Sequence, residues 1–269
     1  MKFRSPSHSG LSLSACIITL NEEQNLPRCL DSISGIVDEV VVVDSLSTDR
    51  TRQIASAAGA RVFPHPFRGY VGQKQLALEK ATGDWALCLD ADEWLSEALR
   101  DNIAQLMERG PGTGIAGYRL KRKTFYLGRW LRHHDSSDWK LRLVRRDPAR
   151  WTGSGPHDLH ERLEVEGRVG RLKGELCHHP HKTLSEHVLR VQEFTDILAR
   201  NPPGPMRTLF GMTVEPGMAF LKRYLLQGGF LDGVPGLTFA FMDAAYFFLR
   251  HAKAWEARHG RSRWAGKQS

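Results

Sequence analysis

The sequence lacks several features by which large classes of protein are recognised. Among its 269 residues are four cysteines, Cys16, Cys29, Cys88 and Cys177, and none has C-x-x-C spacing. This scatter predicts buried free thiols rather than disulfides or zinc ligands. Residues 1–10 are basic and polar, so we expect no secretory signal. No apolar run reaches the roughly 18 residues of a membrane-spanning helix. Together these absences predict a cytoplasmic protein.

Two common nucleotide-binding motifs are also missing. The glycine-rich motif G-x-G-x-x-G does not follow the first predicted strand, and the chain has no G-x-x-x-x-G-K-[ST] loop. Their absence argues against an ordinary dehydrogenase or kinase. The composition, with 41% hydrophobic and 25% charged residues, is that of a globular chain that can bury a sizeable core.

Positive charge is in excess and unevenly distributed. The formal net charge is +8, and residues 119–150 hold 11 Lys/Arg against three Asp. The tail beyond Arg250 is basic again. A basic surface predicts contact with phosphates, in a nucleotide, a nucleic acid or an anionic membrane. We do not expect a nucleic-acid partner, because the acids described next would repel a phosphate backbone at a shared binding face.

Apolar periodicity predicts alternating strands and helices in the first half of the chain. Short apolar or β-branched runs predict strands, and apolar residues spaced by three and four predict helices. The predicted strands are 13–19, 39–44, 61–63 and 85–89, and the predicted helices are 26–33, 50–58, 70–81 and 96–109. This alternation predicts an α/β fold with a Rossmann-like, mostly parallel sheet flanked by helices.

The stretch GDWALCLDADEWL, residues 83–95, is the strongest functional signal. It begins as a buried strand and ends with Asp90, Asp92 and Glu93 within four positions. If the strand continued, Asp90 and Asp92 would point to the same side. Adjacent carboxylates repel each other unless a cation or a hydrogen-bond donor lies between them. The pattern predicts a divalent cation that holds phosphate oxygens, or else acids that only cap the next helix.

Acids follow three of the predicted strands. Glu22 follows the first strand, Asp44 ends the second, and the pair Asp90 and Asp92 ends the fourth. In an open parallel sheet, ligands bind beyond the carboxyl ends of the strands. Helix capping alone does not account for acids at three such ends. We therefore expect a ligand site at this edge of the sheet.

Four segments in this order resemble glycosyltransferase family 2, the inverting nucleotide-sugar transferases with the GT-A fold. They are IITLNEEQNL (17–26), VVVDSLSTDRT (41–51), GYVGQKQLALEKATGDW (69–85) and LDADE (89–93). Further landmarks are RLVRR (142–146), HERL (160–163), HHPHKTL (178–184) and FLKRYLLQGGFLDGVPGL (220–237). These are most similar to bacterial lipopolysaccharide-core transferases that add glucose to inner-core heptose. The chain departs from its relatives at Lys74-Gln75, where they have Arg-Asn, and at HHPHKT (178–183), where they favour H-[YF]-[ST]-[YF]-[KR]-[ST].

The resemblance implies a uridine diphosphate (UDP) sugar as donor. It assigns the uridine-binding loops to Thr19, Asn21, Glu22 and Asp44. The carboxylate of Asp44 can accept the imide N–H of uracil. Lys74 is expected either to support the diphosphate electrostatically or to be an exposed helix lysine.

The resemblance also implies a divalent cofactor, Mg²⁺ or Mn²⁺. Asp92 is expected to hold the cation against both phosphates, and Asp90 to bind the ribose or a metal-bound water. His178 matches a late histidine of the family and is a further candidate contact for metal or phosphate. Zinc is disfavoured, because no cysteine or acid pair with zinc spacing accompanies the histidines.

An inverting transfer needs a general base for the acceptor hydroxyl. The segment 151–163 supplies Asp158 and Glu161, each beside a histidine. The His-Glu motif of the family places the role on Glu161, with Asp158 second and Asp138 third. Alternatively, Glu161 only pairs with an arginine. Arg142, Arg145 and Arg146 are expected to line the acceptor side, where phosphorylated sugars suit fork-shaped cations.

We expect a GT-A domain at 1–183 and a helical region at 184–269. Segments 219–226 and 237–255 are apolar nearly all round and are followed by cations. Such segments pack in a core or lie at a membrane interface. With a lipid-linked saccharide as the expected acceptor, we favour peripheral contact with the anionic inner face of the plasma membrane. The alternatives are transfer to a polyprenyl phosphate, a capsule intermediate or a protein, or a sugar-nucleotide sensor without catalysis.

Overall fold

The structure is a computed structural model that describes residues 10–133, 138–153, 161–199 and 204–264. The chain forms two compact units. The first comprises Met1–Lys123 and Ser137–His178, and the second comprises Thr124–Ser136 and His179–Ser269. The expected division after residue 183 differs from this grouping, in which 124–136 belong with the C-terminal helices.

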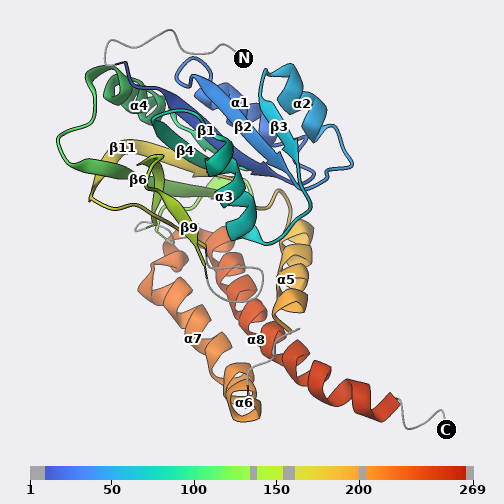
Figure 1. The fold of residues 1–269 in the computed structure, drawn as a ribbon. Coiled ribbons are helices and arrows are strands. Elements are labelled where there is room, and N and C mark those ends of the chain that lie inside the picture. The colour runs from blue at the N-terminus through green and yellow to red at the C-terminus, as the bar shows by residue number, and fades with distance from the viewer. Residues whose placement is uncertain (1–9, 134–137, 154–160, 200–203, 265–269) are drawn as a thin grey trace. The chain divides into compact units, whose positions relative to one another are not determined.

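Four parallel strands form one half of the sheet in the first unit (Figure 1). They are β1 (Leu13–Thr19), β2 (Glu39–Asp44), β3 (Arg61–Pro64) and β4 (Trp85–Asp90), arranged in the order β3-β2-β1-β4. The pairing registers align Thr19 with Asp44 and Ile18 with Asp90. The polar residues that end these strands are therefore brought to one edge of the sheet, as the sequence predicts.

Helices cover this half of the sheet on both faces. They are α1 (Leu26–Ile33), α2 (Thr51–Ala57), α3 (Tyr70–Lys80) and α4 (Glu97–Arg109). Successive strand residues divide between two apolar clusters, since a strand points its side chains alternately to its two faces. Ala15 and Ile17 pack in the cluster that includes α1, α2 and α4, whereas Cys16 packs in the cluster that includes α3. The predicted α/β fold with flanking helices is confirmed.

Strands of mixed direction extend the sheet beyond β4. They are β8 (Trp139–Arg145), β6 (Ile115–Tyr126), β11 (Arg168–His178) and β5 (Glu93–Leu95), in the order β4-β8-β6-β11-β5. A separate two-stranded hairpin consists of β9 (Arg150–Thr152) and β10 (Arg162–Glu164). Trp151 and Leu163 are partners in this hairpin, and both pack in the α3-side cluster. The hairpin thus lies on the same face of the sheet as α3.

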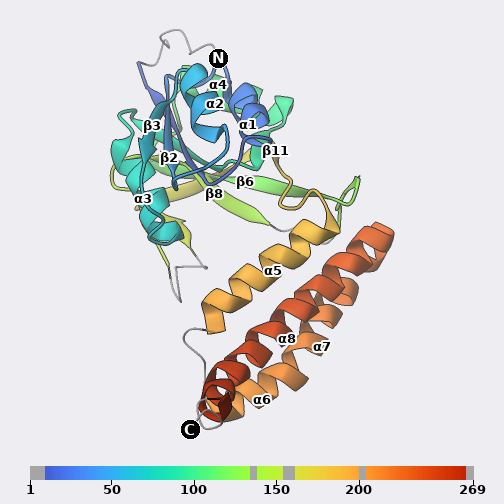
Figure 2. The ribbon, with the colours of Figure 1, turned by 90° about the vertical axis from the view of Figure 1, so that its right-hand side faces the viewer.

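The second unit is mainly helical (Figure 2). It comprises β7 (Arg129–Trp130), which pairs with the end of β6, then α5 (Leu184–Ala199), α6 (Pro205–Thr213), α7 (Glu215–Leu221), a π-helix (Lys222–Leu226), a 3-10 helix (Gly229–Asp232) and α8 (Gly233–Trp264). The carboxylate of Asp232 accepts hydrogen bonds from the backbone N–H groups of Arg132 (2.9 Å) and His133 (3.2 Å). These bonds explain why 124–136 group with the helices.

Helix α8 packs against α5, α6 and α7 but leaves an apolar stripe uncovered. Its exposed residues between positions 234 and 255 are Val234, Phe241, Phe248 and Trp255, with 73%, 59%, 44% and 53% of their surface exposed. They lie seven residues apart, which is two helical turns, and therefore share one side of the helix. Within the described ranges, no helix is both long enough and apolar enough to cross a bilayer.

Candidate active site

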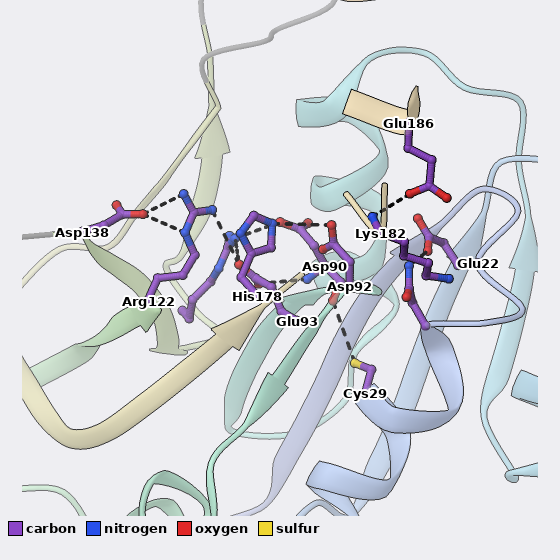
Figure 3. A network of polar contacts seen from close by, with 12 residues as sticks. Glu22, Cys29, Asp90, Asp92, Glu93, Arg122, Asp138, His178, Lys182 and Glu186 are labelled. Atoms are coloured by element: carbon purple, nitrogen blue, oxygen red, sulfur yellow. Dashed lines mark hydrogen bonds and ion pairs between the residues drawn. The ribbon is translucent and has the colours of Figure 1, made fainter. Parts of the chain in front are cut away.

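The acids at the end of β4 lie where the chain turns from one strand into the next. β4 ends at Asp90, residues 91 and 92 form a turn, and β5 begins at Glu93. The backbone N–H of Asp90 donates to Oε2 of Glu93 at 3.1 Å. Because the extended geometry ends at Asp90, Asp90 and Asp92 are not consecutive residues on one face of a strand. They have different partners, as Figure 3 shows.

Two buried cations bind Asp90. Nζ of Lys74 lies 2.8 Å from Oδ1, and Nη2 of Arg142 lies 2.8 Å from Oδ2. Burial alone would raise the pKa of Asp90, but Lys74 and Arg142 together hold it well below its usual range. The reverse effect acts on Lys74: burial lowers its pKa, and the nearby carboxylate of Asp90 raises it above the ordinary value. Lys74 is therefore not an exposed helix lysine, since 5% of its side chain is exposed.

Arg142 links Asp90 to a second acid. Its Nη2 also donates to Oε1 of Glu93 at 2.9 Å, and the side chain of Glu93 is completely buried. Arg122 lies 3.9 Å from the same oxygen and pairs at 2.6 Å with Asp138 (Figure 3). The structure thus places Arg142 inside the acid cluster, and its expected acceptor-binding role stays a prediction. Asp138, the third candidate base, is paired with Arg122.

Asp92 has a different kind of partner. Its Oδ2 lies 3.4 Å from Nε2 of His178, the last residue of β11. Burial raises the pKa of Asp92, but the imidazole beside it brings the pKa below the ordinary value. The register of β11 with β5, which pairs His178 with Glu93, brings the histidine to this place.

Asp92 and His178 fit a divalent cation as a two-residue ligand pair. Two ligands about 2.1 Å from one octahedral ion lie about 3 Å apart, close to the observed separation. Nδ1 of His178 is buried and has no hydrogen-bond partner among the described residues. Within that part of the chain, no group of three or more His, Cys, Asp or Glu side chains is arranged to hold an ion alone. Phosphate oxygens and water would have to complete the coordination.

Asp44 organises the two loops expected to bind uridine. Its carboxylate accepts hydrogen bonds from the hydroxyl of Thr19 at 2.8 Å and from the hydroxyl and backbone N–H of Ser47 at 2.5 and 2.8 Å. Asp44 is fully buried and Thr19 is 3% exposed. In this arrangement Asp44 connects the ends of β1 and β2, and its oxygens are not presented to solvent.

Asn21 and Glu22 are more accessible members of the same loops. Asn21 is exposed and has a φ of 55°, a left-handed conformation that asparagine tolerates better than most residues. Its side-chain oxygen accepts from the backbone N–H of Thr48 at 2.9 Å. Glu22 is half-buried, and Asn25 donates to its carboxylate at 2.7 Å. The first two loops are therefore fixed to each other, with Asn21 on the surface.

Glu161 lies immediately before β10, and the structure brings it to the acid cluster. Its Oε1 is 2.8 Å from Nζ of Lys74, which also binds Asp90. The expected alternative partner, an arginine, is replaced by this lysine. Asp158 lies outside the described residues. One cation therefore connects the candidate base to the candidate metal-site carboxylate, a link that sequence spacing alone could not show.

Arg145 and Arg146 lie at the far end of β8 from this cluster. The guanidinium of Arg145 lies 5.9 Å from the centre of the Trp85 ring. Arg146 donates to the backbone carbonyl of Gly83 at 2.9 Å and pairs with Asp147. Both contacts are at the beginning of β4, whereas Asp90 is at its end. An acceptor-binding role for these two residues stays a prediction.

Glycosyl transferase family 2 is the family whose model matches this chain, over residues 14–162. That range begins at the second residue of β1 and holds the other three parallel strands, the acid cluster and Glu161. The lipopolysaccharide core biosynthesis glycosyltransferase LpsC of Rhizobium meliloti (strain 1021) is 33% identical over 90% of this chain and 94% of its own length. The chain belongs to glycosyl transferase family 2.

Other comparisons extend over nearly the whole chain. A glycosyltransferase of Rickettsia bellii (strain RML369-C) is 44% identical over 90% of this chain and 85% of the relative. The solved mannosyltransferase PcManGT from Pyrobaculum calidifontis, in complex with GDP-Man and Mn²⁺, has a TM-score of 0.51 and 16% identity, and covers 94% of this chain and 89% of that one. This likeness shows the shared fold. The family 2 assignment and the GT-A fold that the sequence predicts are confirmed, and the protein is a glycosyltransferase.

Proposed function

We propose that this family 2 enzyme is an inverting, metal-dependent glycosyltransferase that moves a sugar, glucose by resemblance, from a UDP-sugar to a lipopolysaccharide-core acceptor. One observation carries the proposal: Lys74 binds Glu161 and Asp90 at 2.8 Å each. The candidate base is thereby held beside the acids at the carboxyl end of β4. An inverting transfer needs the general base and the group that binds the diphosphate to lie close together, because the acceptor attacks the sugar opposite the departing diphosphate.

The donor site is proposed for the loops after β1 and β2. Among the four residues expected to bind uridine, Asn21 and Glu22 are the accessible ones, and the buried Asp44 fixes the two loops to each other. We assign uridine to this site on the resemblance of the segments IITLNEE and VVVDSLSTD. Thr19 and Asp44 would then shape the pocket, with the base and ribose held by Asn21, Glu22 and backbone groups.

Asp92 and His178 are proposed to hold the divalent ion. When bound, Mg²⁺ or Mn²⁺ stabilises negative charge on the departing diphosphate. Imidazole is a softer ligand than carboxylate and suits transition-metal ions, so this pair favours Mn²⁺ over Mg²⁺. Lys74 adds a second positive charge near the same acids, although Asp90 and Glu161 already share it.

Glu161 is proposed to accept the proton of the attacking hydroxyl. A base must lie within hydrogen-bond reach of that proton. Lys74 keeps the Glu161 carboxylate at a fixed place beside Asp90, and 23% of the Glu161 side chain is exposed to an incoming acceptor. The acceptor is proposed to be a lipid-linked saccharide of the lipopolysaccharide core, because LpsC, a relative over almost its full length, is named for that pathway.

The second unit is proposed to bring the enzyme to the anionic inner face of the plasma membrane. The apolar stripe of α8 is uncovered, and the second unit has 14 Lys/Arg against 8 Asp/Glu. Aromatic side chains on one helix face together with surrounding cations are typical of interfacial binding. Phe248→Glu should abolish co-sedimentation with vesicles that contain phosphatidylglycerol. Binding that persists in this variant would exclude the stripe as the contact.

Glu161→Gln is the variant that tests the catalytic proposal. It preserves the shape of the side chain but cannot accept the proton, so turnover should fall by roughly 10²- to 10⁴-fold. UDP affinity, measured by calorimetry, should be nearly unchanged. Glu166→Gln, on an exposed residue five positions further along, is the matched control and should retain full turnover.

The opposite result would redirect the assignment. If Glu161→Gln transfers sugar at the parent rate, Asp158→Asn and Asp138→Asn identify whether another acid is the base. If all three variants are active, the acceptor is already an anion, as a polyprenyl phosphate would be. A screen of nucleotide sugars with and without Mn²⁺, followed by release of nucleoside diphosphate, identifies the donor.

A further inference from the structure

The hairpin β9–β10, which carries Glu161 at its edge, is attached to α3 by two adjacent residues. The side-chain oxygen of Gln75 accepts the backbone N–H of Trp151 at 2.9 Å. The neighbouring Lys74 binds Glu161 at 2.8 Å, and its Nζ lies 4.9 Å from the centre of the Trp151 ring. Trp151 is therefore held by both residues of the Lys74-Gln75 pair.

A small cavity lies beneath this attachment. Its volume is about 10 Å³, and Lys74, Asp90, Arg142 and Trp151 line it together with apolar residues of β1, β4 and α3. Nε of Arg142 and Nε1 of Trp151 are buried and have no hydrogen-bond partner among the described residues. The two residues are 5% and 6% exposed. Two unpaired N–H donors thus belong to residues that line one cavity.

The size of the cavity and the charges of the side chains around it limit which molecule can accept hydrogen bonds from these two N–H groups. A buried N–H group without a partner is costly, so such groups are nearly always paired with protein or water. A cavity of about 10 to 15 Å³ has room for one water molecule. An anion is disfavoured, because Asp90, Glu93 and Glu161 already exceed the two cations Lys74 and Arg142 in charge. A neutral oxygen that accepts two hydrogen bonds fits the site.

We propose that Trp151 is a positioning residue for Glu161 and acts through one buried water shared with Nε of Arg142. This inference rests on the proposed role of Glu161 as the base. The water joins the hairpin to the arginine that binds Asp90, while Gln75 and Lys74 fix the hairpin to α3. The three connections together set where the Glu161 carboxylate lies relative to the acids at the end of β4.

Two substitutions break separate connections in the full-length protein. Trp151→Phe keeps an aromatic ring but removes the indole N–H, and Gln75→Leu removes the acceptor of the Trp151 backbone N–H. Each should lower kcat by roughly 5- to 10-fold, which corresponds to about 1.0 to 1.4 kcal/mol. KM for the UDP-sugar should stay within roughly twofold, because displacement of the base affects the chemical step and not donor binding. Gln105→Leu on the exposed face of α4 is the matched control and should leave both constants unchanged.

The water itself is tested by NMR on protein with ¹⁵N-labelled tryptophan. The chain has seven tryptophans, and the indole signal lost in Trp151→Phe identifies Trp151. That N–H should exchange slowly with solvent and show a cross-peak to a long-lived water. A solvent-shielded Trp151 N–H without such a cross-peak, or parent kcat in Trp151→Phe, overturns the proposal. The result is separable from the proposed function: parent turnover in Glu161→Gln refutes the base, whereas an inactive Glu161→Gln with unaffected Trp151→Phe refutes only the positioning role.

Discussion

Replacing Arg142 by methionine distinguishes a structural cation from an acceptor-binding one. Methionine is apolar and flexible enough to fill part of the space left by the guanidinium. If Arg142 lined the acceptor side, the substitution would raise KM for the acceptor and leave the fold intact. In the structure its Nη2 binds both Asp90 and Glu93 and the side chain is 7% exposed. We therefore expect a loss of stability instead.

The structure also indicates which acid causes most of the loss. Asp90 keeps Lys74 at 2.8 Å after the substitution, so it stays paired. Glu93 is completely buried, and its other cation, Arg122, is 3.9 Å away. Removing one partner of a buried ion pair typically costs about 3 to 5 kcal/mol, because the remaining charge is left uncompensated. A typical domain has about 5 to 15 kcal/mol of stability in total, so Arg142→Met should still fold but unfold at much lower urea.

A double-mutant cycle measures the interaction between Arg142 and Glu93 directly. Arg142→Met leaves the charge of Glu93 without a close cation, and Glu93→Gln removes that charge. The double variant should therefore be about 1 to 3 kcal/mol more stable than the sum of the two single effects predicts. Arg145→Met, three residues along the same strand and exposed, should change stability by less than about 0.5 kcal/mol. Urea unfolding followed by fluorescence and circular dichroism supplies the values. A cost below about 1 kcal/mol for Arg142→Met, with a raised acceptor KM, would refute the structural role and restore the acceptor-binding one.

Three further outcomes are expected. Asp44→Asn should weaken UDP binding, measured by calorimetry, because it loosens the loops that Thr19 and Ser47 join to Asp44, and the acceptor KM should be unaffected. Equal UDP affinity in parent and variant would count against the uridine assignment. Chelation of divalent ions should abolish transfer, and His178→Ala should reduce Mn²⁺ affinity by roughly 10- to 100-fold without unfolding the protein; full activity in excess chelator would remove the metal from the mechanism. The second unit should lose stability as the pH falls from about 6.5 to about 4, because burial lowers the pKa of His187 to about 4. Over that interval the unfolded state binds the proton before the folded state does, which lowers the free energy of unfolding by about 3 kcal/mol at the lower end. His187→Gln should therefore flatten the slope of stability against pH.

The parallel half of the fold could be predicted because each strand is short, apolar and bounded by turn residues. Glu39–Asp44 and Trp85–Asp90 are buried along almost their whole length, and such runs have few alternatives to a central strand. The half of the sheet beyond β4 could not be predicted in this way. In Ile115–Tyr126 and Trp139–Arg145, basic residues are interspersed with apolar ones, so composition suggests a basic belt. Only the pairing register shows that these cations belong to strands.

The candidate site, too, could be predicted only in part from the sequence. The acids could be located from the sequence, because strand ends in an open sheet meet at one edge, and the structure brings Asp90, Asp92 and Glu161 into one unit as expected. Their partners could not be predicted, since Lys74 and Arg142 reach Asp90 from α3 and β8. The burial of Asp44 was equally inaccessible to sequence, because it depends on hydrogen bonds across two loops.

These pairings bear on which acid is available to a metal ion. Asp90, Glu93 and Glu161 each have a cation at 2.8 to 2.9 Å, and a metal that replaced any of these contacts would remove one of the two carboxylate partners of a buried lysine or arginine. Asp92 is different, because its partner is an imidazole at 3.4 Å that can itself ligate an ion when neutral. An ion at Asp92 and His178 therefore displaces the least. We therefore propose separate tasks for the two aspartates of the motif: Asp92 would bind the metal, and Asp90, fixed by Lys74 and Arg142, would connect the proposed base to the sheet.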